Sequence, residues 1–123
     1  MIRINEVAFT GYPVTDMPRA RGFYEDVLQL KPANVWENEG RHWIEYELGP
    51  ATLAISNMWP TWRPSSDGPC IAFEVADFDV ALAELRRRGV KFALEPIDSG
   101  SCQLAIVADP DGNAVAIHRR KQS

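Results

Sequence analysis

The sequence predicts an α+β domain built from two βαβββ modules, and three observations support this fold class. A polar turn, Asp109-Pro110-Asp111-Gly112-Asn113, separates two apolar runs. It is typical of a β-hairpin, because proline presets φ and glycine supplies a positive φ. Apolar residues recur at helical spacing once in each half of the chain. Asp16 and Asp77 mark matching points of the two halves, which indicates an internal repeat.

The first half of the chain shows the pattern of one strand, one helix and three strands. A β-prone run at residues 7–14 predicts the first strand, and Pro13 ends or bulges it because proline cannot donate to a ladder. Thr15 or Asp16 caps the helix that follows. The expected buried stripe of this helix consists of Met17, Ala20, Phe23, Tyr24, Val27 and Leu28. The remaining strands are expected at residues 33–39, 41–48 and 52–56.

The second half repeats this pattern after a connector at residues 58–68 that carries prolines and two tryptophans. Residues 70–75 alternate between apolar and polar and predict a strand. Ala76-Asp77 caps a helix, and Gly89 ends it. Its stripe consists of Phe78, Ala81, Leu82 and Leu85, and strands follow at residues 90–94, 103–108 and 114–118. We therefore expect one domain, residues 1–123, with modules at about 1–57 and 69–123.

Composition excludes several classes of function. The net charge of −4 argues against a nucleic-acid or anionic-membrane surface. No apolar run approaches the ~20 residues of a membrane span. The first residues lack the apolar core of a signal peptide, so we expect a cytoplasmic protein. Cys70 and Cys102 are too few for a disulfide framework and fit free thiols in a reducing compartment.

Three segments resemble one known family. Residues 14–28, Val-Thr-Asp-Met-Pro-Arg-Ala-Arg-Gly-Phe-Tyr-Glu-Asp-Val-Leu, look like the first-helix signature of the glyoxalase/bleomycin-resistance/dioxygenase superfamily, also called the vicinal oxygen chelate superfamily. Residues 72–77 and 85–90 resemble the start of its second module, and residues 109–113 resemble its final hairpin. The resemblance implies mixed sheets that curl around a cavity. It also implies a homodimer.

The resemblance further implies where a divalent metal would lie. Active members use one residue from each of four strands, typically His or Gln, Glu, His and Glu. The matching positions here are Phe9, Ala54, Cys70 and Ala116. Only the Cys70 thiol could coordinate a cation, whereas a site needs three or four N, O or S ligands. A shift of three residues in the first strand would place Glu6 at the first position and still leave two ligands absent. We therefore expect no family metal site and no cofactor.

The candidate ligand-binding residues are aromatic or polar side chains expected near the cavity. His118 shares a strand face with Ala116 and is either a polar anchor or general base, or a rim histidine. Glu74 either binds a cationic ligand or pairs with Arg41 or another basic group. The tryptophans either wall or cover the cavity, or pack in the core and at an interface. The complete set is Phe9, Trp36, Trp43, Glu45, Trp59, Trp62, Cys70, Glu74 and His118.

Three functions remain open from the sequence. The preferred one is metal-independent binding of a small, planar or cationic molecule, because sequestration needs affinity and no metal chemistry. The second is a metal-dependent lyase, isomerase or dioxygenase with a site rebuilt from Glu6, Glu45, Glu74 or His118. The third is a partner-binding domain whose cavity is filled by bulky side chains. Nucleophilic catalysis by Cys70 or Cys102 with His118 would need a lowered thiol pKa, which the sequence does not indicate.

Overall fold

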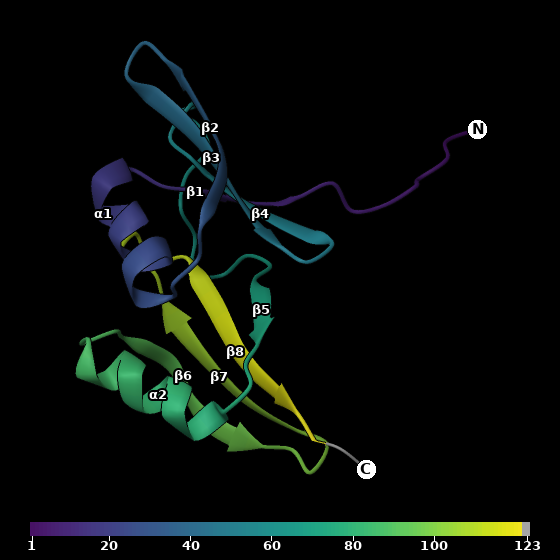
Figure 1. Cartoon of the computed structure of the whole chain (residues 1–123), viewed down its shortest axis with the longest axis vertical. Helices are drawn as coiled ribbons and strands as arrows, with labels where there is room; N and C mark the ends of the chain where they lie inside the picture. The colour runs from purple at the N-terminus through teal and green to yellow at the C-terminus, as the bar shows by residue number, and fades with distance from the viewer. Residues whose placement is uncertain (122–123) are drawn as a thin grey trace. The chain divides into compact units, whose positions relative to one another are not determined.

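The computed structural model describes residues 1–121, which form two compact units, residues 1–64 and the residues from Ser65 onward. Each unit holds one four-stranded sheet (Figure 1). The strand orders are β1-β4-β3-β2 and β5-β8-β7-β6. In both sheets the first and last strands of the unit pair in parallel, and the other pairs are antiparallel. The predicted α+β class and the two βαβββ modules are confirmed, as open sheets with free edges.

The first strand of the first unit begins later than the sequence predicts, and the other strands of this unit lie within one residue of their predicted bounds. They are β1 (Thr10–Pro13), α1 (Met17–Arg21), the π-helical segment η1 (Gly22–Val27), β2 (Pro32–Asn38), β3 (Arg41–Leu48) and β4 (Ala51–Ser56). The expected strand start at residue 7 is wrong, because residues 1–9 are exposed and β1 begins at Thr10, opposite Leu53. Figure 1 shows this N-terminal segment running away from the sheet.

The predicted first helix is confirmed at its start and changes character after one turn. Asp16 is the cap, because its Oδ1 accepts a hydrogen bond from the backbone N–H of Arg19 at 3.0 Å. Beyond Arg21 the backbone hydrogen bonds join residues five apart in sequence, which is the pattern of a π-helix. The N–H of Leu28, for example, donates to the carbonyl of Phe23 at 3.0 Å. Val27 and Leu28 are consequently only half-buried.

Three tyrosines fix this helix to one face of the first sheet. Tyr24 stacks on Tyr12 of β1 and on Tyr46 of β3, with ring centroids 6.4 and 6.3 Å apart. The Tyr46 hydroxyl donates to Glu25 Oε2 at 2.8 Å, and Arg21 Nε donates to the same oxygen at 2.6 Å. Burial and this carboxylate raise the pKa of Tyr46. The opposite face of the sheet is therefore the open one.

The second unit follows the same plan with an aliphatic core. Its elements are β5 (Ile71–Glu74), α2 (Phe78–Arg87), β6 (Phe92–Asp98), β7 (Cys102–Ala108) and β8 (Ala114–Arg120). Asp77 caps α2 by accepting from Val80 N at 3.1 Å, and Gly89 follows it at φ +73. Strand β6 extends past the predicted end at 94, with register shifts on both sides of Leu94. Pro96 lies within the second shift, where a missing donor is tolerated.

The predicted hairpin turn is confirmed and is buried at both ends. Ala108 pairs with Ala114, and the turn between them holds Asp109 and Asn113, which are 4% and 2% exposed. Asp109 Oδ1 accepts from the backbone N–H groups of Asp111 and Asn113, both at 2.9 Å. Asp109 Oδ2 accepts from Asn113 Nδ2 at 2.9 Å. The turn thus satisfies most of its buried polar groups itself, and Asn113 Oδ1 accepts from the backbone N–H of Ser65 at 3.1 Å.

Candidate functional site

The open face of the first sheet carries the largest concentration of predicted ligand-binding residues. Strand pairing places Gly11, Ala54 and Glu45 in one row across β1, β4 and β3, with Asn34 of β2 at its end. Trp43 lies in the next row, between Ser56 on β4 and Trp36 on β2. The small residues in the middle of the sheet therefore allow aromatic side chains to lie close to its backbone.

Phe9, Trp43 and Trp59 form a chain of edge-to-face aromatic contacts on this face. The ring centroids of Phe9 and Trp43 are 5.1 Å apart, and those of Trp43 and Trp59 are 6.1 Å apart. Both distances lie in the favourable range for T-shaped pairs. Phe9 is 43% exposed and Trp59 is 57% exposed, so their rings remain available to a ligand. We call Phe9, Trp43, Trp59 and Trp62 the aromatic cluster.

Gly11 allows the fourth ring to lie close to the strand. A Cβ at this position would be 2.9 Å from Trp62 Cη2 and 3.3 Å from Phe9 Cε2. A glycine is therefore required for this approach. The connector tryptophan is thereby brought onto β1, as part of the same face that carries Trp43.

Glu45 supplies a carboxylate beside the aromatic cluster. Its Oε2 accepts from Trp43 Nε1 at 3.0 Å, and its Oε1 accepts from Asn34 Nδ2 at 3.4 Å. These donors hold the carboxylate on the open face, where it is half-buried. A negative group next to indole faces suits a flat cation, which gains both Coulomb and cation–π attraction.

A cavity of about 350 Å³ adjoins the cluster at the ends of β1 and β4. It shares Trp59 and Trp62 with the cluster and adds two guanidinium groups, those of Arg41 and Arg63. Sequence reasoning missed both arginines. No periodic signal joins the first residue of β3 to a connector residue, so only the folded chain shows that they line the same space.

The second unit brings Glu74 and His118 together on its own open face. They are direct partners across β5 and β8, and His118 Nδ1 lies 2.5 Å from Glu74 Oε1. Arg120 N donates to Glu74 Oε2 at 2.6 Å. This backbone donor and the imidazole lower the pKa of the Glu74 carboxyl. Glu74 thus pairs with a basic group, as one sequence reading expected, and the partner is His118.

The positions that match the family's metal ligands do not fit a metal. Ala54 and Gly11 face each other across β4 and β1, and Ala116 faces Ala72 across β8 and β5, so these strand positions offer no donor atoms. Phe9 precedes β1, and Cys70 precedes β5. Within residues 1–121, no group of three or more His, Cys, Asp or Glu side chains is arranged to hold a metal ion. Glu6, the alternative ligand, lies in the exposed N-terminal segment.

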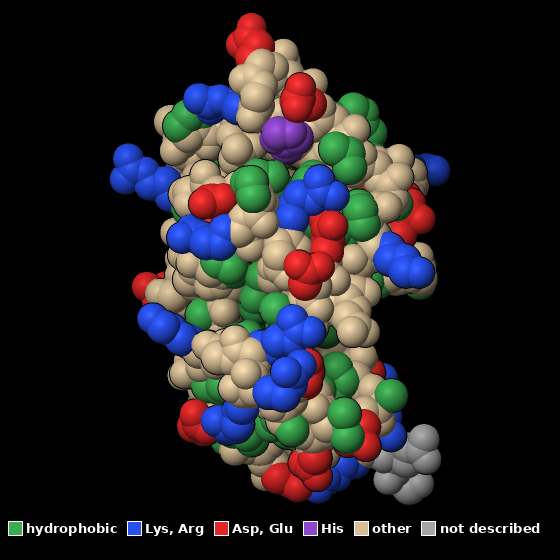
Figure 2. All heavy atoms as spheres, turned by 60° about the vertical axis from the view of Figure 1, so that its left-hand side comes forward, with side chains coloured by type: hydrophobic (Ala, Val, Ile, Leu, Met, Phe, Trp, Pro, Cys, Tyr) green, Lys and Arg blue, Asp and Glu red, His purple; other side chains and the backbone are tan. Residues whose placement is uncertain are grey.

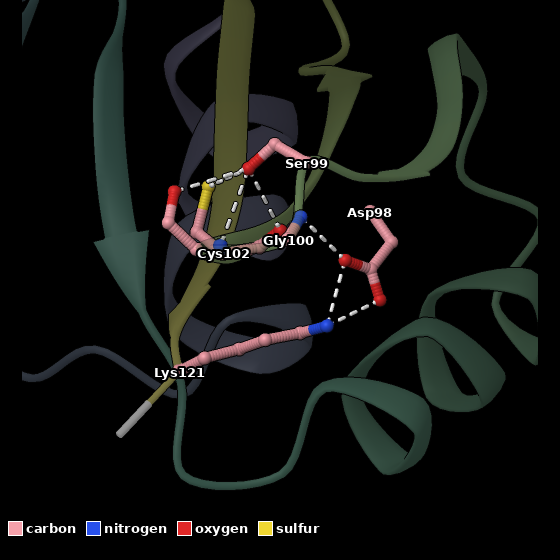
Figure 3. Close-up of polar contacts among 6 residues, drawn as sticks. Asp98, Ser99, Gly100, Cys102 and Lys121 are labelled. Carbon is pink, nitrogen blue, oxygen red and sulfur yellow. Dashed lines mark hydrogen bonds and ion pairs between the residues drawn. The ribbon is translucent and has the colours of Figure 1, made fainter. Parts of the chain in front are cut away.

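The contacts of Cys102 are those of a strand connection. Cys70 and Cys102 are free thiols. Cys102 is the first residue of β7, and Figure 3 shows its contacts with Ser99 in the turn after β6: Ser99 Oγ lies 3.3 Å from Cys102 Sγ and accepts from the backbone N–H of Cys102 at 3.2 Å. Asp98 closes the same turn by accepting from Gly100 N and Lys121 Nζ. These contacts organise a strand connection.

Charged side chains of both signs are visible on one face of the molecule (Figure 2). Figure 2 shows cationic and anionic side chains interspersed over the face drawn, with hydrophobic side chains between them. None of the helices among the described residues is long and apolar enough to cross a membrane.

Comparisons with known proteins agree with the fold. A comparison with curated protein sequences found no match. Among solved structures, TnmS3, an antibiotic binding protein from Streptomyces sp. CB03234, has a TM-score of 0.78 at 23% identity, covering 98% of this chain and 100% of its own. A glyoxalase/bleomycin resistance protein from the same organism has a TM-score of 0.73 at 23% identity, covering 91% and 98%.

An enzyme shows the same architecture. The trypanothione-dependent glyoxalase I of Leishmania major has a TM-score of 0.77 at 22% identity, covering 94% of this chain and 87% of its own. At this level of identity, the three likenesses show the fold alone. The family model described as the Glyoxalase/Bleomycin resistance protein/Dioxygenase superfamily matches residues 3–117. The chain therefore belongs to the glyoxalase/bleomycin resistance protein/dioxygenase superfamily.

Proposed function

We propose that this protein binds a small planar molecule on the open face of its first sheet, without the metal used by active members of the superfamily. The observation that carries the proposal is the aromatic cluster above Gly11 and Ala54. Stacking on these rings needs no metal, and the positions of the family ligands offer no donors beyond the Cys70 thiol. The antibiotic-binding relative of the same fold supports a binding function.

Glu45 sets the preferred charge of the ligand. Its carboxylate is held beside Trp43 by two hydrogen bonds, so it is positioned before a ligand arrives. A planar cation would place its ring on the indoles and its charge near this carboxylate. The proposed site residues are Phe9, Trp43, Glu45, Trp59 and Trp62, with Trp36 as the outer wall on β2.

A thermal-shift screen tests the proposal. The panel comprises planar cations such as proflavine, neutral planar analogues, non-planar cations and bleomycin. We expect the melting temperature to rise with the planar cations, and the rise to disappear in Glu45→Gln for the charged compounds. No stabilisation by any planar compound would contradict the proposal.

Elemental analysis tests the alternative of a metal-dependent enzyme. The proposal predicts that protein purified without chelators carries no stoichiometric divalent metal. A bound metal at one per chain would favour a lyase, isomerase or dioxygenase with a rebuilt site. Such a site would have to recruit groups such as Glu6, Glu45, Glu74 or His118, which do not form a cluster of three within the described residues.

The proposed setting is a cytoplasmic homodimer. Two free thiols suit a reducing compartment. Val35 and Trp36 on the edge strand β2 are 50% and 51% exposed, and such side chains gain from burial against a second chain. Light scattering coupled to size-exclusion chromatography measures the mass, and a monomer at micromolar concentration would contradict the dimer.

A further inference from the structure

We infer that the cavity at the ends of β1 and β4 is a second binding site, which receives the acidic group of a planar carboxylic acid or phosphate monoester. The cavity of about 350 Å³ lies wholly within the first unit. The residues that carry the inference are Thr15, Arg41, Asn57, Trp59, Trp62 and Arg63. The first three lie at or just beyond the ends of strands β1, β3 and β4, and the others come from the connector.

The charge of the lining selects an anion. Arg41 and Arg63 supply two guanidinium groups, and among the described residues that line the cavity none is acidic. This contrasts with the chain as a whole, whose net charge is −4. A guanidinium presents several N–H donors in a plane that matches the geometry of carboxylate and phosphate oxygens. Two of them around one small space favour a ligand with a concentrated negative charge.

Arg41 is held in place by the chain that borders the cavity. Its Nη1 donates to the carbonyl of Met58 at 3.0 Å. This bond uses one of the five N–H groups of the guanidinium and leaves others for a ligand. The anchor ties the start of β3 to the connector, so the charge is positioned before a ligand binds.

Asn57 adds a neutral donor to the same lining. Its Oδ1 accepts from the backbone N–H of His42 at 2.7 Å, which fixes the orientation of the amide. Among the described residues, no side chain or backbone group accepts a hydrogen bond from Asn57 Nδ2, so this group can donate to an anion. The cavity thus combines two charged donors and one neutral donor.

Trp59 and Trp62 make the remainder of the site suitable for a flat ring. The backbone N–H of Trp62 donates to the carbonyl of Trp59 at 3.1 Å, so a tight turn presents both indoles from one short segment. Ligand pockets start at about 300 Å³. The observed volume therefore suits a compact aromatic acid with one or two rings.

The inference does not rest on the proposed planar-cation site, and the two can fail separately. The cation site depends on Glu45, which carries the opposite charge and does not line the cavity. Glu45→Gln should therefore weaken the binding of proflavine and leave the binding of an aromatic acid unchanged. Substitution of Arg41 or Arg63 should weaken the binding of the aromatic acid and leave the binding of proflavine unchanged.

Isothermal titration with 2-naphthoate, 2-naphthyl phosphate and neutral 2-naphthamide tests the inference. We expect at least one of the two acids to bind at least tenfold more tightly than the amide, and its affinity to fall as salt is raised. The better acid distinguishes a carboxylate site from a phosphate site. Equal affinity for acid and amide, or no binding of either acid, would overturn the inference.

Arginine variants locate the site. Arg41→Gln and Arg63→Gln should each lower the affinity for the acid at least tenfold. Arg63→Lys should lower this affinity less than Arg63→Gln. Arg87→Gln on α2 is the matched control, because it removes an exposed arginine of the second unit and should leave the affinity unchanged. Circular dichroism is used to check that each variant is folded. Full retention of acid binding in the Arg41→Gln, Arg63→Gln double variant would contradict this site.

Discussion

At equivalent positions of the two sheets, the first unit has Gly11, Ala54 and Glu45 in a row, and the second has Ala72, Ala116 and Ile106. One row further along, Trp43 stands where the second unit has Leu104, and Ser56 stands where it has His118. Strand order and pairing directions are the same in both units. The open faces therefore differ in chemistry while the ladders beneath them do not.

The covered faces explain why this divergence is tolerated. In the first unit three stacked tyrosines join the helix to the sheet, and in the second Phe78, Leu82 and Leu85 of α2 are buried. Both solutions remove large apolar surfaces from water, which supplies the main free energy of folding. The open faces add less to stability, so they are free to carry an aromatic site in one unit and a Glu–His pair in the other.

Truncation of a buried isoleucine should have the largest effect on the free energy of unfolding, and it compares the cores of the two units. Ile55→Ala and Ile117→Ala each remove a buried side chain from equivalent strands β4 and β8, and each should cost about 2–5 kcal/mol. All four tryptophans lie in residues 1–64, so their fluorescence reports on the first unit. In urea unfolding followed by fluorescence, Ile55→Ala should shift the midpoint more than Ile117→Ala. An equal shift would show that the two cores unfold as one.

Tyr46 of the first unit gives the next largest effect, and the second unit has no equivalent hydroxyl. Tyr46→Phe removes the hydrogen bond to the Glu25 carboxylate and should lower the free energy of unfolding by about 1.5–3 kcal/mol. The equivalent residue of the second unit is Val107, which has no polar group to lose. Urea titration of the variant measures the loss, and a change below 0.5 kcal/mol, about the smallest cost expected for any buried hydrogen bond, would contradict the role of this contact.

The same tyrosine predicts an alkaline limit to stability. Its raised pKa means that the folded state keeps the proton while the unfolded state releases it near the ordinary value of 10.0. The contribution is complete below that pH and is lost as pH rises through the raised pKa of the folded state. The wild type should therefore lose stability above about pH 10 more steeply than Tyr46→Phe. Parallel pH profiles of the two proteins would contradict this explanation.

Gly11→Ala should have a moderate effect on the open face and little effect on the fold. The new Cβ would lie 2.9 Å from Trp62, whereas the equivalent residue of the second unit, Ala72, already carries a Cβ. We expect Trp62 to move, its fluorescence maximum to shift and planar-ligand affinity to fall several-fold. Ala72→Gly is the control and should leave both properties unchanged. An unchanged spectrum in Gly11→Ala would contradict the close packing of Trp62.

The smallest expected effect concerns the Glu–His pair of the second unit. The pKa of Glu74 is lowered from 4.5, so its contribution to stability is present above that pH and is lost as pH falls through the lowered value. Melting temperatures measured between pH 7 and pH 3 should decline less in Glu74→Gln than in the wild type. An identical decline would mean that the carboxylate is not stabilised by Arg120 N and His118 in solution.

Local sequence signals predicted the framework well. The sequence predicts a cap at Thr15 or Asp16 and another at Ala76-Asp77, and the structure shows that the two aspartates accept from the first free N–H groups. The final hairpin followed from a turn whose residues bond one another. Strand β3 was predicted at its observed bounds, because Ile44 and Tyr46 alternate with polar neighbours.

Irregular local structure and contacts between residues distant in sequence were not predicted. The π-helical bonds of η1 follow from no simple periodicity, and the first strand was expected too long because residues 7–9 are β-prone. Phe9 and Trp62 meet across Gly11, and Arg41 shares a cavity with Arg63. The residue types were visible in the sequence, but their grouping depends on strand pairing and on the path of the connector.

Titration of the metal-free protein with proflavine is the most direct test of the proposed binding face. In EDTA, we expect proflavine to quench tryptophan fluorescence saturably, Trp43→Leu to weaken binding at least tenfold, and Leu104→Ala at the equivalent position of the second unit to leave it unchanged. Binding that is lost on chelation, or that is equal in wild type and Trp43→Leu, would contradict the account.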